Sequence, residues 1–69
     1  MIIDNIIHID EQEFAEVEYQ GGNELVVFLV NQRKIILYDI SEEEYLHLYK
    51  HPSALTIRKL MSSHRYQEF

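Results

Sequence analysis

Two strongly apolar runs lie within residues 24–40, and four polar residues join them. This pattern predicts a β-hairpin whose connection is Asn31, Gln32, Arg33 and Lys34. In the first run both alternating sets of side chains are apolar, namely Leu25, Val27 and Leu29 in one set and Val26, Phe28 and Val30 in the other. Successive strand residues point to opposite faces, so both faces of this sheet need cover. We expect helices on one face and a different cover on the other.

The length and composition fit one domain spanning residues 1–69. The chain has no cysteine, which rules out disulfides, thiolate metal sites and a cysteine nucleophile. A folded chain of this size buries only about 60% of the surface that it exposes when unfolded, so its stability is marginal. The core must therefore suffice, or a second subunit must add to it.

The chain is acidic, with a net charge of −6, and the charge is unevenly spread. Residues 1–49 hold eleven carboxylates against two cations, whereas residues 50–69 hold four cations against one carboxylate. The first residues lack the basic start and apolar run of a secretory signal, and no stretch is long enough to span a bilayer. We expect a cytoplasmic protein, from a prokaryote or its virus, without a membrane partner.

Two further strands are expected before the hairpin. Closely spaced isoleucines predict a strand near residues 2–9, followed by a turn over residues 10–13. In residues 14–19 the pattern alternates, which places Ala15, Val17 and Tyr19 inside and Glu16 and Glu18 in water. Residues 21–23, Gly-Gly-Asn, can adopt the positive φ angles of a tight reversal. The next strands should then cover residues 24–30 and 34–40.

Two helices are expected after the strands. Ser41 and Glu44 match a capping box, which predicts a helix over residues 42–50 with Tyr45, Leu48 and Tyr49 on its apolar side. Residues 51 and 52, His-Pro, end that helix, and a second helix begins near residue 53. Its apolar positions are Leu55, Ile57, Leu60 and Met61. Strands followed by helices define an α+β protein, with a small antiparallel sheet of about four strands and two helices packed on one face.

The spacing of residues 25–66 resembles the KTSC domain, a bacterial module found alone or at the end of some lysyl-tRNA synthetases. The matching positions are Leu25, Val27, Leu29, Ile40, Ser41, Tyr45, Leu48, Ser53 and Tyr66. The Tyr-x-Tyr of that family is replaced by Ile35 and Leu37. The resemblance implies an α+β fold and a role in RNA binding, although the family's central tyrosines are missing.

The second sheet face is the first candidate site. If the helices cover the opposite face, an apolar patch is left exposed, and patches of several hundred Å² usually mark an interface. The expected partner interface is Val26, Phe28, Val30, Ile36, Tyr38 and Ile40. The alternative is that residues 2–9 or the C-terminal tail fold over this face.

The basic C-terminal part is the second candidate site, for nucleic acid. Its expected contacts are Arg58, Lys59, Arg65 and Tyr66, with Lys50 nearby. Four cations in an acidic chain would bind phosphate weakly and in a salt-sensitive way. The alternative is that these cations neutralise neighbouring carboxylates.

Histidines and carboxylates do not form a recognisable catalytic or metal motif. His47 and His51 have the spacing of two ligands on one helix face, but His51 precedes Pro52 and the H-E-x-x-H pattern is absent. His8 and His64 stand alone, so we expect solvated histidines and no metal. The carboxylates lie in a turn, on an outward strand face and at a helix start, where solvation and capping explain them. The alternative is an acidic surface that mimics nucleic acid or docks on a basic protein.

These observations favour a small binding module without a catalytic centre or cofactor. The leading hypothesis is protein-protein interaction, including self-association as a homodimer, as in an accessory or inhibitor protein of a phage or mobile element. RNA binding through the basic end is the second hypothesis. A small ligand held in a groove between subunits is the third.

Overall fold

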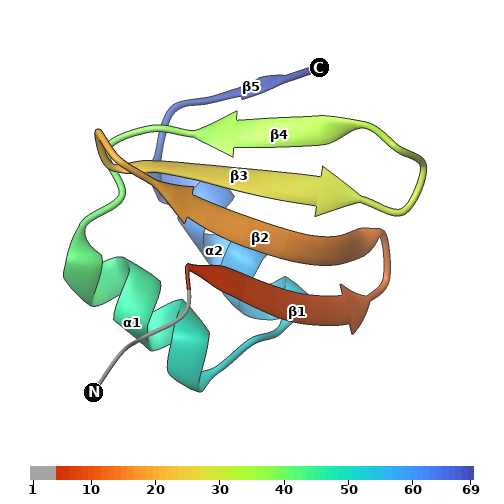
Figure 1. The fold of residues 1–69 in the computed structure, drawn as a ribbon, viewed down its shortest axis with the longest axis horizontal. Coiled ribbons are helices and arrows are strands. Elements are labelled where there is room, and N and C mark those ends of the chain that lie inside the picture. Colours follow the sequence, from red (N-terminus) through yellow and green to blue (C-terminus); the bar gives the residue numbers. More distant parts are fainter. Residues whose placement is uncertain (1–4) are drawn as a thin grey trace.

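The computed structural model describes residues 5–69, which form five strands and two helices. The elements are β1 (Ile6–Glu11), β2 (Phe14–Gln20), β3 (Glu24–Leu29), β4 (Lys34–Leu37), α1 (Glu42–Lys50), α2 (Ala54–Ser63) and β5 (Tyr66–Glu68). The strands form one antiparallel sheet in the order β1-β2-β3-β4-β5, so every strand pairs with its neighbours in the sequence of strands (Figure 1).

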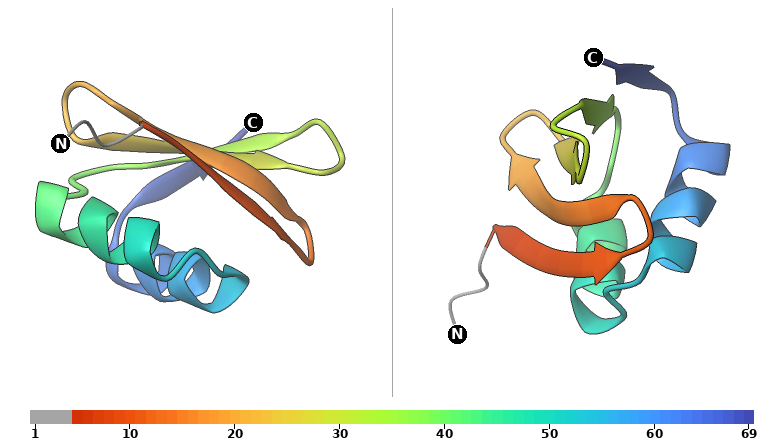
Figure 2. Two further views of the ribbon diagram at one scale, coloured as in Figure 1. Left: turned by 60° about the horizontal axis from the view of Figure 1, so that its bottom comes forward. Right: turned by 90° about the vertical axis from the view of Figure 1, so that its right-hand side faces the viewer.

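Both helices lie on one face of the sheet and leave the other face open (Figure 2). The core fills the space between the two layers. Its completely buried members are Val17, Leu25, Val27, Leu37, Ile40, Leu48 and Ile57. The α+β fold with helices on one face is therefore confirmed, and the sheet has a fifth strand beyond the four that we expected.

Serine side chains cap the starts of both helices, and the cap of α1 is the one predicted. The Ser41 hydroxyl accepts a hydrogen bond from the Glu44 backbone N–H, and the Glu44 carboxylate accepts one from the Ser41 N–H, which completes the capping box of α1. Ser53 caps α2 in the same way by accepting from Thr56 N–H. The first turn of α2 has no acidic residue of its own, and Glu11 from β1 supplies a carboxylate that accepts from Ala54 N–H at 2.9 Å.

The first hairpin differs from its prediction. Residues 1–4, part of the strand expected over 2–9, lie outside the described residues, and β1 continues to Glu11 where a turn was expected. Asp10 and Gln12 both have positive φ angles, and the pairing of β1 with β2 shifts register beyond His8. A second shift between Phe14 and Glu16 turns the Phe14 ring into the core, at 2% exposure, while Ala15 stays half-buried. Such bulges break the simple alternation used for the prediction.

Two further positions correct the predicted faces. Strand β4 ends at Leu37, not at residue 40, and Asp39 has a φ of 60° that redirects the chain. Ile40 consequently lies in the core at 0% exposure and is not part of the expected interface. In α2, Leu55 is 63% exposed, and its neighbour Ala54 takes the buried position instead.

The unexpected strand β5 closes the free edge of β4. Tyr38 N–H donates to the Arg65 carbonyl at 2.9 Å, and Lys34 and Phe69 exchange backbone hydrogen bonds at the other end. The three residues of β5 lie within this pairing. The C-terminal segment therefore extends the sheet at its edge and does not lie across the open face (Figures 1 and 2).

Candidate interaction surface on the open sheet face

The open face is the sheet face opposite α1 and α2, and its centre is apolar. The strand pairing places Val26 of β3 between Glu18 of β2 and Ile36 of β4. In the next row Phe28 lies between Glu16 and Lys34. The apolar centre thus consists of adjacent side chains on β3 and β4, bordered by charged side chains on both sides.

Burial within this centre is uneven. Val26 is only 4% exposed, because β3 is the middle strand and longer side chains surround it, whereas Phe28, Ile36 and Tyr38 are half-buried. Val30 lies beyond the end of β3 and is 63% exposed. Strand pairing therefore brings Val26, Phe28 and Ile36 of the expected interface together, with Tyr38 directly after β4, whereas Val30 lies in the turn beyond β3 and Ile40 in the core.

Tyr38 lies at the β5 side of the open face in a polar and cationic setting. Its hydroxyl donates a hydrogen bond to the Gln67 side-chain carbonyl at 2.8 Å, and the guanidinium carbon of Arg65 lies 5.4 Å from its ring centroid. Residues Tyr38, Arg65, Tyr66 and Gln67 line an open depression of about 420 Å³. The cation-π contact holds a positive charge against the aromatic ring.

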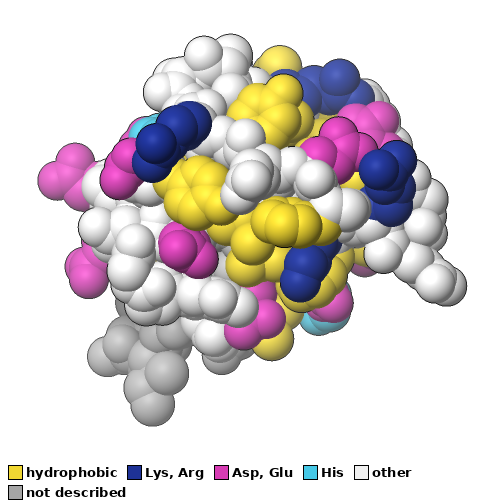
Figure 3. Space-filling view, turned by 90° about the horizontal axis from the view of Figure 1, so that it is seen from above, with side chains coloured by type: hydrophobic (Ala, Val, Ile, Leu, Met, Phe, Trp, Pro, Cys, Tyr) yellow, Lys and Arg dark blue, Asp and Glu magenta, His cyan; other side chains and the backbone are white. Residues whose placement is uncertain are grey.

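Charges on the open face are segregated by strand. Glu16 and Glu18 lie on β2, and His8 on β1 contacts Glu16 at 3.5 Å. Lys34 lies on β4 with its ammonium 5.8 Å from the Phe69 ring, and Arg65 precedes β5. A space-filling view from above shows hydrophobic side chains in the middle, with lysines, arginines and carboxylates around and among them (Figure 3).

The charged border of this face was not predicted, although part of the signal is present in the sequence. The alternation in β2 already pointed Glu16 and Glu18 outward, and a Gly-Gly-Asn turn fixes which β3 residues lie beside them. Lys34 ends the predicted hairpin connection and begins the strand predicted over residues 34–40, and in the structure it is the first residue of β4. The placement of Arg65 depends on β5, for which the sequence gives no periodic pattern.

The predicted nucleic-acid contacts do not form one cluster. Arg58 on α2 forms an ion pair with Glu13, hydrogen-bonds Gln12 at 2.7 Å and lies over the Phe14 ring, all at the β1-β2 turn. Lys59 is exposed on α2. Arg65 and Tyr66 lie at the β5 edge of the sheet, away from Arg58. Arg58 therefore neutralises a carboxylate, while Arg65 belongs to the open face.

The histidines are also dispersed. The rings of His47 and His51 have centroids 4.9 Å apart, so the predicted pair does meet at the end of α1. Within residues 5–69, however, His, Asp and Glu side chains nowhere form a group of three or more that could hold a metal ion. Two neighbouring imidazoles provide fewer ligands than a protein zinc site uses.

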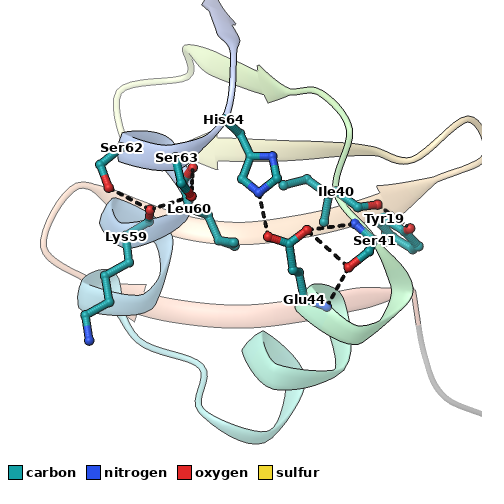
Figure 4. Close-up of polar contacts among 9 residues, drawn as sticks. All are labelled: Tyr19, Ile40, Ser41, Glu44, Lys59, Leu60, Ser62, Ser63 and His64. Carbon is teal, nitrogen blue, oxygen red and sulfur yellow. Dashed lines mark hydrogen bonds and ion pairs between the residues drawn. The ribbon is translucent and has the colours of Figure 1, made fainter.

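His64 and Glu44 connect the two helices (Figure 4). The imidazole Nε2 lies 2.6 Å from a Glu44 carboxylate oxygen, and an ionised carboxylate can only accept, so Nε2 carries the proton. Partial burial alone would raise the pKa of Glu44, but hydrogen bonds from the Ser41 N–H, His64 and the Ser41 hydroxyl outweigh it and lower the pKa. This contact links the start of α1 to the end of α2.

A second depression, of about 250 Å³, lies between β2 and α1 and was not anticipated from the sequence. It is lined by Asn5, Tyr19, Glu42, Tyr45 and Leu46. The rings of Tyr19 and Tyr45 stack with centroids 4.6 Å apart, and the Tyr19 hydroxyl donates to the Ile40 carbonyl at 2.7 Å. Burial, followed by the nearby carboxylates Glu42 and Glu44, raises the pKa of Tyr19. The neutral hydroxyl therefore serves as a donor that anchors the chain before α1.

These features define an α+β protein with one open sheet face that is apolar at its centre and charged at its border. Comparison of the chain with protein-family models, curated proteins and solved structures finds no match. The resemblance to the KTSC domain therefore stays a prediction. Among the described residues, neither helix is long and apolar enough to cross a membrane.

Proposed function

We propose that this protein is a non-enzymatic binding module that docks on a protein surface through its open sheet face. The observation that carries the proposal is the apolar centre formed by Val26, Phe28, Ile36 and Tyr38, which no helix covers. Interfaces combine such a centre of aromatic and aliphatic anchors with a polar rim. The carboxylates of β2 and the cations of Lys34 and Arg65 provide that rim.

The test compares two aspartate substitutions in apolar side chains. Phe28→Asp places a charge in the proposed contact, whereas Leu55→Asp introduces the same charge at an exposed apolar residue on α2. Both variants and the parent are checked for folding by far-UV circular dichroism, then compared by native mass spectrometry and affinity capture. We expect association to be lost with Phe28→Asp and retained with Leu55→Asp. Equal association in both variants would refute the docking face.

RNA binding is the second candidate function, supported by the position of Arg65 over the Tyr38 ring beside Tyr66. Single-stranded nucleic acid is bound by aromatic stacking combined with cations that contact phosphates. This site predicts RNA affinity that falls with salt and with Arg65→Ala, while Lys59→Ala on α2 has a smaller effect. An absence of binding at low salt, measured by fluorescence anisotropy, would reject it.

A further inference from the structure

The charges of the open face follow the order of its strands. The carboxylates of Glu16 and Glu18 lie on the β2 side of the apolar centre, and the cations of Lys34 and Arg65 lie on the β4-β5 side. Glu24, at the start of β3, is the exception, since it lies near the middle. The face thus has an acidic side, an apolar middle and a basic side.

Such a face is complementary to itself in only one of two simple orientations. Two sheets that pack face to face keep their strands within about 30° of each other, and a closed dimer relates them by a two-fold axis between the sheets. A two-fold axis perpendicular to the strands would place β2 of one copy over β2 of the other. Like charges would then face each other across the interface. An axis parallel to the strands reverses the strand order, so that the β2 side of each copy faces the β4-β5 side of the other.

We propose that the open face binds a second copy of this chain, with the two-fold axis parallel to the strands near β3 and β4. This inference rests on the proposed docking function and names its partner. Glu16 and Glu18 of each copy face the Lys34 and Arg65 side of the other, and both borders gain opposite charges. The two apolar centres meet on the axis, where the half-buried side chains of Phe28 and Ile36 are shielded from water above the already buried Val26.

The size of the face is sufficient for a modest dimer. Five strands spaced by about 4.8 Å, averaging about five residues that rise about 3.3 Å each, give roughly 24 by 17 Å. Both copies together then bury on the order of 800 Å², which is the size of a weak, transient interface. We therefore expect a dimer that dissociates on dilution, with the charged border determining the orientation.

The experiment reverses each charged side separately. One double variant is Glu16→Lys with Glu18→Lys, and the other is Lys34→Glu with Arg65→Glu. The second changes the net charge from −6 to −10, so its matched control is Lys50→Glu with Lys59→Glu, which makes the same change at exposed helix residues. Masses are measured by sedimentation and light scattering over a concentration series, after circular dichroism has established folding.

The parent and the control should reach twice the 8.3 kDa chain mass at high concentration. Each reversed variant alone should remain monomeric, and an equimolar mixture of the two should recover the dimer mass. A monomeric parent, a dimer indifferent to the reversals, or reversed variants that fail to recombine would overturn the proposal.

The docking function and the second-copy proposal fail in different ways. A monomeric parent that still captures a partner protein through Phe28 leaves the docking function in place and rejects the second copy. A monomeric parent that binds RNA through Lys34 and Arg65 rejects both in favour of the nucleic-acid alternative.

Discussion

Replacing Glu44 with alanine is expected to destabilise the fold by about 2 kcal/mol, although Glu44 is a surface residue of α1. Its carboxylate accepts from the Ser41 N–H at 3.0 Å, from the Ser41 hydroxyl at 3.1 Å and from His64 at 2.6 Å. The substitution therefore opens half of the capping box and leaves the His64 N–H without its acceptor.

The magnitude follows from the exposure of the partners. A hydrogen bond to a charged group contributes about 1.5–3 kcal/mol when it is well buried. The Glu44 side chain is 35% exposed and the His64 side chain 13%, so solvent screening reduces this range. We assign about 1 kcal/mol to the cap and about 1 kcal/mol to the His64 contact. Glu43→Ala is the matched control, because among the described residues Glu43 has no such partner and acts through the helix dipole, worth about 0.5 kcal/mol.

Thermal unfolding followed by circular dichroism at neutral pH measures the difference. A gap of about 1.5 kcal/mol corresponds to a melting temperature roughly 6–12 °C lower for Glu44→Ala than for Glu43→Ala. The pKa of Glu44 is lowered from 4.5 in the folded state, so its contribution is present above that value and is lost as the pH falls through the folded pKa. Equal melting temperatures for the two variants, or a gap that widens below pH 4, would refute this reasoning.

Two other substitutions test the interior. Ile40→Ala removes a completely buried side chain and should reduce the free energy of unfolding, measured by urea titration, by about 2–5 kcal/mol. The control Val30→Ala, at an exposed residue, should change it by less than about 0.5 kcal/mol. Similar losses in the two variants would contradict the core position of Ile40. Tyr19→Phe removes the hydrogen bond to the Ile40 carbonyl but keeps the stacked ring, so about 1 kcal/mol should be lost. A loss as large as that of Tyr19→Ala would show that the hydroxyl alone anchors this segment and that the stacked ring adds nothing, which would contradict this estimate.

Both helices could be predicted closely because their signals are local. The Ser41 and Glu44 pair fixes the start of α1, and α1 spans residues 42–50 as predicted. Ser53 caps α2 directly after His51 and Pro52. A cap is made by side chains within three residues of the helix start, so the sequence contains the whole interaction.

The strand boundaries depend on backbone angles that composition does not reveal. Asp10, Gln12 and Asp39 adopt positive φ angles although none of them is glycine. Each one redirects the chain, which brings Phe14 into the core and removes Ile40 from the open face. Alternation predicts faces correctly only between such positions, as it does for Val26 and Phe28.

The candidate surface combines both kinds of information. Its apolar centre could be predicted because two neighbouring strands are apolar in both registers. The basic part of its border could not, because Arg65 reaches this face only when the three-residue strand β5 pairs with β4, which places Arg65 opposite Tyr38 at the other end of β4 from Lys34. That pairing is long-range and contributes little periodic signal, yet it converts an acidic chain into one with a basic side on its open face. A chain with a net charge of −6 would repel a copy of itself if its charges were evenly spread, so the segregation of charge across the sheet is what makes a second copy a physically reasonable partner.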